Sequence, residues 1–211
     1  MEGDSDELIA GDLTKGYYGE VTSDTFINGN DLASQIGLSA GTAFNSDAGW
    51  LKFSLDNKTL YVAKRPFKYG ISWNSINAIG AVTGTSNITI NGKLFLVRLL
   101  KGRSVAGTGS GYDLANTHNS EWNRLMYHVS VSPNRGNTTS EGISVGDWAQ
   151  FSNTELGILK GNGGATWTQE ISSGYATSRV YDTASVAYVT ADLPTSVIAL
   201  YGWRPCLELV E

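Results

Sequence analysis

The sequence predicts an α+β fold, because three kinds of local pattern alternate along one chain of 211 residues. Several short segments alternate apolar and polar residues, which is typical of half-buried strands. Two segments carry an N-capping residue followed by apolar residues at helical spacing. Long stretches rich in Gly, Ser, Thr and Asn lie between them. We therefore expect short antiparallel sheets, two helices and long loops.

Two hairpins are predicted in the first half of the chain. Asp56 and Asn57 form a turn between two alternating segments, and Asn91 with Gly92 is the dipeptide most typical of a two-residue hairpin turn. Further alternating segments follow in the C-terminal third. The strands that we expect are residues 51–55, 59–63, 87–90, 94–100, 165–170, 185–189 and 197–209.

Two main helices are predicted from their capping residues. Ser72 precedes the helix expected at residues 73–79, and Asn119 or Ser120 precedes the one expected at residues 121–129. A short helix is also expected at residues 30–36. The second main helix has one apolar face, formed by Trp122, Leu125, Met126 and Val129.

The polar segments divide the chain into an arm and a domain. Residues 1–45 are rich in Gly, Asp and Thr, and we expect an extended N-terminal arm there. Residues 46–211 then form the domain, with surface loops at 101–119 and 132–164.

Composition and charge exclude several classes of protein. The net charge of -5, with no basic run, makes nucleic acid an unsuitable partner. A single cysteine, Cys206, excludes an internal disulfide, and two histidines, His118 and His128, exclude a three-histidine metal site. We expect no cofactor.

Nothing in the sequence predicts membrane insertion. The longest apolar stretch, residues 94–100, is interrupted by Arg98 and is far shorter than the about 18 residues that a spanning helix needs. The acidic start, residues 1–7, lacks the positive and apolar regions of a signal peptide. We expect synthesis in a cytoplasm.

The order of these segments resembles a known family. Residues 201–209 (YGWRPCLEL) resemble the closing strand of C-type-lectin-like domains of the formylglycine-generating-enzyme type, and residues 120–125 (SEWNRL) resemble their central helix. A fuller set of segments, within residues 11–209, resembles structural proteins of tailed-bacteriophage virions. These segments are residues 16–21 (GYYGEV), 50–53 (WLKF), 71–76 (ISWNSI), 88–102 (ITINGKLFLVRLLKG) and 203–205 (WRP).

The resemblance implies a C-type-lectin-like domain in a non-enzymatic virion structural protein. Such a protein would be assembled in the host cytoplasm, decorate the particle or tail and contact the host surface. Its partners would be other virion proteins and further copies of itself. The arm would dock onto these neighbours through Tyr17, Tyr18, Val21, Phe26 and Ile27. The alternative is that the arm folds back on its own domain.

The resemblance also raises two kinds of metal site, and the residues support neither. Formylglycine-generating enzymes hold copper with a pair of cysteines, whereas Cys206 stands alone and is expected to be a small buried residue. Calcium-dependent lectins use a Glu-Pro-Asn or Gln-Pro-Asp loop followed by Trp-Asn-Asp, and these motifs are absent from the sequence.

Two other functions stay open from the residues. Aromatic side chains beside loops could contact a glycan without calcium, and the candidates are Trp148, Trp167, Tyr175 and Tyr181. Large aromatics more commonly fill the core, as we expect of Trp122, Trp167 and Trp203. A polysaccharide hydrolase would need two converging carboxylates. The candidates for such a pair are Glu121, Glu141, Asp147, Glu155, Glu170 and Asp182.

Overall fold

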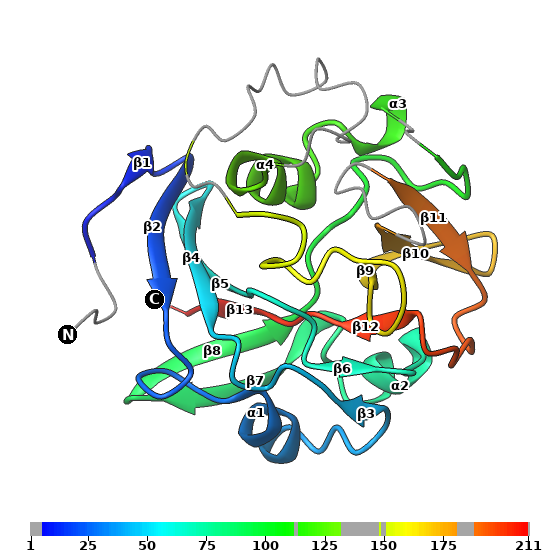
Figure 1. Ribbon diagram of the computed structural model, residues 1–211, viewed down its shortest axis with the longest axis horizontal. Coiled ribbons are helices and arrows are strands. Elements are labelled where there is room, and N and C mark those ends of the chain that lie inside the picture. The colour runs from blue at the N-terminus through cyan, green and yellow to red at the C-terminus, as the bar shows by residue number, and fades with distance from the viewer. Residues whose placement is uncertain (1–5, 112–113, 132–147, 149–150, 181–187, 211) are drawn as a thin grey trace.

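The computed structural model describes residues 6–111, 114–131, 148, 151–180 and 188–210. It has the predicted α+β class, with two sheets and short helices (Figure 1). The seven-stranded sheet is antiparallel throughout. Its strands, in spatial order, are β1 (Ala10–Gly11), β2 (Lys15–Val21), β4 (Trp50–Leu55), β5 (Lys58–Ala63), β13 (Cys206–Leu209), β8 (Lys93–Arg98) and β7 (Thr83–Ile90).

The second sheet has six strands and one parallel pair, β9 with β12. Its strands, in spatial order, are β11 (Val189–Asp192), β10 (Tyr175–Arg179), β9 (Ala165–Ser172), β12 (Tyr201–Trp203), β6 (Lys68–Tyr69) and β3 (Thr42–Ala43). Residues 181–187, which hold most of the strand expected at 185–189, lie outside the described residues.

The C-terminal segment joins the two sheets. A single strand was expected at residues 197–209, but β12 lies in one sheet and β13 in the other. Pro205 separates them, because it has no N–H for a sheet ladder, while its carbonyl accepts a hydrogen bond from Ala63 N at 2.9 Å. β13 pairs with both β5 and β8, so the last strand lies inside a main sheet, as predicted.

Both predicted hairpins are confirmed. The β4–β5 turn places Asp56 and Asn57 at φ of 51° and 63°, and the β7–β8 turn places Asn91 and Gly92 at 50° and 78°. Two successive positive φ angles are what a type I′ turn requires, and Asn, Asp and Gly tolerate them best.

The predicted helices are also confirmed. α1 (Gly29–Gln35) is capped by Asn28, α2 (Trp73–Ala78) by Ser72, and α4 (Glu121–Val129) by Ser120. The prediction of an unbroken loop at 101–119 is wrong, because α3 (Leu114–Thr117) lies within it. α3 is a single turn, and a segment that short has no apolar period to detect.

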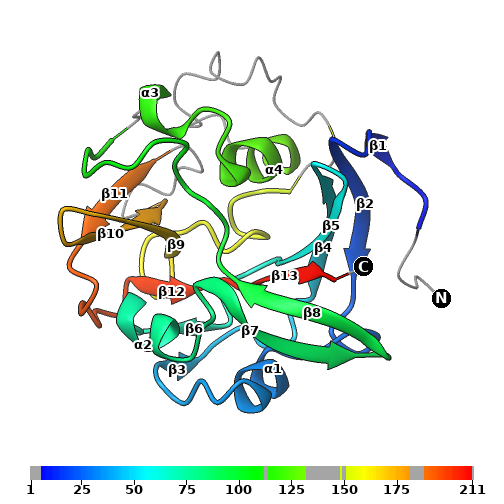
Figure 2. The same cartoon turned by 180° about the vertical axis from the view of Figure 1, so that it is seen from behind.

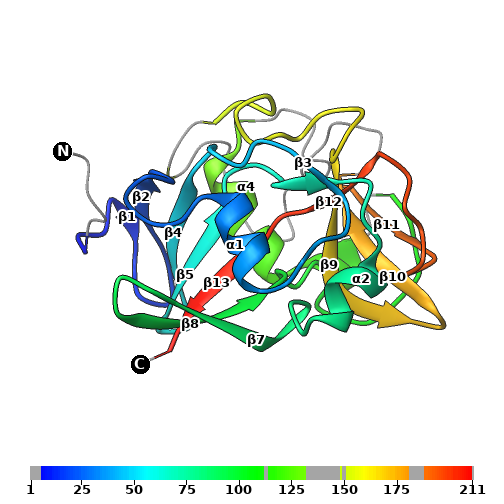
Figure 3. The same cartoon turned by 90° about the horizontal axis from the view of Figure 1, so that it is seen from below.

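Both faces of the seven-stranded sheet are covered. α4 packs against Leu51 and Phe53 on one face, and α1 packs on the other with Trp50 and Tyr61. Figure 1 places the two helices on opposite sides of this sheet, and Figure 2 shows the same arrangement from behind. In Figure 3, seen from below, α1 lies in front of α4. This explains why β4 is buried along its whole length.

The N-terminal segment belongs to the domain, which corrects the predicted separation of an arm at residues 1–45. β2 pairs with β4 along six registered residue pairs, and Leu32 and Ala33 of α1 are buried in the core. Glycine hides this strand from sequence patterns. A Cβ at Gly16 would lie 2.4 Å from the carbonyl oxygen of Asp12, and Gly19 has a φ of 118° beside a register shift.

Candidate functional site

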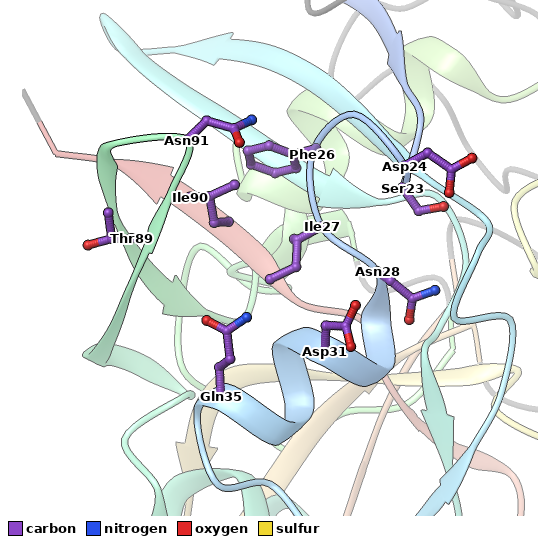
Figure 4. A pocket seen from close by; sticks show the side chains of 10 residues that line it. All are labelled: Ser23, Asp24, Phe26, Ile27, Asn28, Asp31, Gln35, Thr89, Ile90 and Asn91. Carbon is purple, nitrogen blue, oxygen red and sulfur yellow. The ribbon is translucent and has the colours of Figure 1, made fainter.

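The candidate site is an open groove of about 540 Å³ beside α1 (Figure 4). Three segments that are distant in sequence line it: the loop at residues 22–28, α1, and the end of the β7–β8 hairpin. Its volume lies within the about 300–1,000 Å³ that is typical of small-ligand sites. The lining residues are Ser23, Asp24, Phe26, Ile27, Asn28, Asp31, Gln35, Thr89, Ile90 and Asn91.

Hydrogen bonds hold the loop wall of the groove in place. Asn91 Nδ2 donates to the carbonyl oxygen of Thr25 at 3.1 Å, which ties the hairpin turn to the loop. Trp50 Nε1 donates to the carbonyl oxygen of Ile27 at 2.8 Å from the core side. Asn28 Oδ1 accepts from Asn30 N at 2.8 Å and so fixes the start of α1. The groove is therefore formed before any ligand arrives.

The groove has an apolar side that continues into the core. Ile27 and Ile90 are 7% and 6% exposed. Phe26 is half-buried and stacks on Tyr61, with 4.3 Å between ring centroids, and it meets Phe95 edge-on. This aromatic packing fixes the Phe26 ring and supports the adjoining loop.

The polar side of the groove is acidic and has unused hydrogen-bonding capacity. Its lining includes Asp24 and Asp31 and no lysine or arginine. Among the residues that the structure describes, no side chain or backbone group bonds to the side-chain oxygens or nitrogens of Asp24, Asp31 or Gln35. In Figure 4 the side chains of Asp31 and Gln35 rise from α1 toward Ile27 and Ile90. The site can bind hydroxyl or cationic groups, and it repels anions.

The five residues expected to dock the arm onto neighbours lie within the domain instead. Tyr17, Val21 and Ile27 are buried, and Tyr18 and Phe26 are half-buried. Lys52 Nζ lies 5.1 Å from the Tyr18 ring centroid, so this ring also has a partner in its own chain. The alternative, an arm folded back on its own domain, is the arrangement observed. Phe26 and Ile27 line the groove, a role that sequence reasoning missed.

The four aromatic residues proposed for glycan contact do not form one surface in the described structure. Trp167 is fully buried, stacks on Tyr201 at 4.0 Å and donates from Nε1 to the Ile71 carbonyl oxygen, which corrects its assignment as a contact residue. Trp148 is half-buried and stacks on His128 at 4.3 Å. Tyr175 is exposed at the start of β10. Tyr181 lies outside the described residues.

The described candidate carboxylates make structural contacts. Glu121 Oε2 lies 2.6 Å from Arg98 Nη1, and Glu155 Oε2 accepts from Ser152 Oγ at 2.7 Å. Glu170 accepts from Gly102 N at 3.1 Å and from Thr168 Oγ1 at 2.8 Å. The other three candidates, Glu141, Asp147 and Asp182, lie outside the described residues.

Glu170 gives a pH-dependent prediction. Burial raises the pKa of Glu170 despite the hydrogen bonds from Thr168 and Gly102, which act in the opposite direction. A carboxyl whose pKa is higher in the folded state contributes stability below its unfolded pKa and loses that contribution as the pH rises through the folded value. In urea titrations, the free energy of unfolding of the Glu170→Gln variant minus that of wild type should therefore increase as the pH rises from 4 to 8.

The matched control for this prediction is Glu155→Gln. Hydrogen bonds from Ser152 lower the pKa of Glu155. The free energy of unfolding of Glu155→Gln minus that of wild type should therefore decrease as the pH rises. A Glu170→Gln variant that instead loses stability relative to wild type as the pH rises would contradict the burial argument.

Two residues singled out for metal chemistry are core residues. Cys206 is fully buried in β13, as predicted, and burial raises its pKa to about 12. His128 is 4% exposed, because its ring stacks on that of Trp148. Within the described part of the chain, no group of three or more His, Cys, Asp or Glu side chains is arranged to hold a metal ion. Among the described helices, none has the length and apolar character to cross a membrane.

Because the comparisons with known proteins found no match, a function is assigned from the observations above. No protein-family model matches the sequence, no curated protein matches it, and no solved structure matches the fold.

Proposed function

We propose that this chain is a non-enzymatic structural protein of a tailed-phage virion, which decorates the particle or tail and contacts the host surface. One observation carries the proposal. The five segments that resemble virion proteins are elements of the framework: β2, the start of β4, α2, the β7–β8 hairpin and the junction between β12 and β13. The resemblance therefore lies in the scaffold of both sheets rather than in the loops.

The finer fold assignment, a C-type-lectin-like domain, belongs to the same proposal. The segment around Trp203 and Pro205, which resembles the end of that fold, connects the two sheets. α4, which resembles its central helix, packs on the seven-stranded sheet. These positions support the assignment, because both segments belong to the framework of the domain: β13 lies inside the seven-stranded sheet, and α4 packs on that sheet.

The non-enzymatic part of the proposal is supported by the way the described carboxylates are used. Glu121 forms an ion pair with the buried Arg98, and Glu170 accepts a hydrogen bond from the backbone N–H of Gly102. A pair of hydrolytic carboxylates must instead face a substrate, about 5–9.5 Å apart. Incubating the chain with polysaccharides of the host surface should release no new reducing ends.

The virion role is tested by mass spectrometry of purified particles. The chain should be present in particles at a fixed ratio to the major capsid protein, and treatment with nuclease and high salt should leave that ratio unchanged. The matched control is a non-structural phage protein from the same lysate. A chain that occurs only in the soluble lysate would contradict the proposal.

A further inference from the structure

We propose that the exposed edge of β7, together with the acidic groove beside it, binds an extended basic segment of a neighbouring protein as an added strand. The identity of the neighbour rests on the proposed function, because in a virion it would be another virion protein. Three observations carry the inference: an uncovered sheet edge, a groove beside that edge, and negative charge in the groove lining.

β7 is the longest edge strand of the two sheets. β1 and β3 end their sheets with two residues each, whereas β7 has eight. β11, at the remaining edge, has four residues, and its Val189 already pairs with Gly111. Proline and charged residues protect many exposed edges from pairing, and β7 contains neither. Its edge is therefore open to another strand.

Two residues of β7 direct their backbone groups away from the sheet. Ile90 and Lys93 flank the two-residue turn and so form a hydrogen-bonded pair, and this pattern alternates along an antiparallel ladder. Asn87 and Thr89 therefore occupy non-hydrogen-bonded positions opposite β8. Within the part of the chain that the structure describes, no group bonds to the backbone N–H or C=O of either residue. An added strand would satisfy these groups.

The groove lies beside these backbone groups. Thr89 and Ile90 line it from β7, and Asp31 and Gln35 line it from α1 (Figure 4). In Figure 1 both elements lie at the lower side of the molecule, where β7 ends its sheet. Side chains alternate between the two faces of a sheet, and α1 covers one of these faces. Alternate side chains of the added strand would therefore point toward α1 and the groove.

The charge of the groove selects a basic side chain. Asp24 and Asp31 are exposed, and the lining contains no lysine or arginine to compensate them. A lysine or arginine of the added strand would pair with Asp31 and donate to the carboxamide oxygen of Gln35. An acidic side chain in the same place would be repelled.

Two other occupants fit these features less well. The acidic start of this chain, residues 1–7, would bring like charges to the groove. The β7 strand of a second copy would satisfy the backbone groups, but it has no basic side chain to offer. Backbone pairing and charge together favour a basic segment from a different protein.

The experiment titrates the full-length chain with capped heptapeptides of alternating valine and threonine, in which one lysine occupies each position in turn. At least one peptide should bind saturably and shift the ¹H–¹⁵N NMR signals of Asn87, Thr89 and α1. Replacing its lysine with glutamate should raise the Kd by about fivefold or more. Asp31→Asn should raise the Kd of the lysine peptide by about two- to fivefold, as expected when an exposed ion pair is lost.

Methylation of the peptide backbone tests strand addition separately from charge. Every second N–H of an added strand faces its neighbour. Methylating those amides should raise the Kd by about tenfold or more, because it removes the hydrogen bonds to β7. Methylating the intervening amides should leave the Kd close to that of the unmethylated peptide. Acetyl-lysine amide, which has the charge without the strand, should not bind saturably.

A matched variant separates binding from folding. Asp47→Asn removes an exposed carboxylate outside the groove lining and should keep the wild-type Kd. Both Asp31→Asn and Asp47→Asn should melt close to the wild-type temperature, because both side chains are exposed.

Four results would overturn the inference. The first is the failure of every lysine peptide to bind the folded chain. The second is peptide binding that the lysine-to-glutamate change and Asp31→Asn leave unaltered. The third is equal sensitivity to methylation of either set of amides. The fourth is intermolecular contact between the β7 strands of two copies, seen as nuclear Overhauser effects, which would assign the edge to a second copy.

The outcome for the edge is separate from the outcome for the virion role. If the chain is present in particles and binds no peptide, the inference fails and the virion role stands. If it binds the lysine peptide and is absent from particles, the virion role fails and strand addition at β7 stands.

Discussion

Deleting residues 1–45 should abolish the cooperative unfolding of the chain. β4 would lose β2, its neighbour in the sheet, and the core would lose α1. The buried apolar side chains removed are Tyr17, Val21, Ile27, Leu32, Ala33 and Leu38. Burial of one large apolar side chain contributes about 1.5–3 kcal/mol. Since the whole free energy of unfolding of a domain is about 5–15 kcal/mol, their loss exceeds what the rest can sustain.

Circular dichroism and calorimetry measure this effect directly. The deleted chain should show no cooperative melt, and the control that lacks only residues 1–5 should melt like the full chain. A chain lacking residues 1–45 that still melts cooperatively near the wild-type temperature would restore the idea of a separate arm.

Truncating the chain after Tyr201 should have an effect of similar size. The truncation removes β13, which pairs with β5 on one side and β8 on the other. Both strands would be left with unpaired backbone groups in the middle of the sheet, and such groups are costly when buried. The fully buried Trp203, Cys206 and Leu207 would also be lost.

The control for this truncation ends the chain after Leu209. It keeps the whole of β13 and removes Val210, which is exposed, together with the last residue. This control should keep a cooperative melt in calorimetry, whereas truncation after Tyr201 should not. If both truncated chains melted like the full chain, β13 would not be needed by the fold.

Local signals were sufficient to predict most of the framework. Ser72 and Ser120 mark the starts of α2 and α4, because their side chains accept hydrogen bonds from backbone N–H groups of the first turn. Asn91 and Gly92 fix a turn because they tolerate positive φ. These signals depend only on neighbouring residues, so no tertiary information was needed.

The strand β2 and the burial of Arg204 could not be predicted from such local signals. Gly16 and Gly19 belong to the Gly-rich composition that predicted an arm, and only the close approach of neighbouring backbone explains them as strand residues. Arg204 can be buried because its Nη1 donates hydrogen bonds to the carbonyl oxygens of Ala63 and Lys64, at the end of β5. Charged residues are normally expected outside, and nothing near Arg204 in sequence indicates otherwise.

The groove was missed for a related reason. Phe26 and Ile27 attracted attention as apolar residues of an arm, but their role depends on Asn91, which lies in the same groove through folding alone. Short sequence windows hold no signal for a site that three distant segments assemble. A motif search detects catalytic or metal-binding spacings, and a polar groove has no such spacing.

Imaging of intact particles labelled with Fab fragments against this chain tests the central claim most directly. A structural protein on the virion surface should carry Fab density at symmetry-related positions on the head or the tail, and particles that lack the chain should carry none. If the particles carry no Fab density although the same Fab captures the free chain from the lysate, the assignment as a virion protein is contradicted.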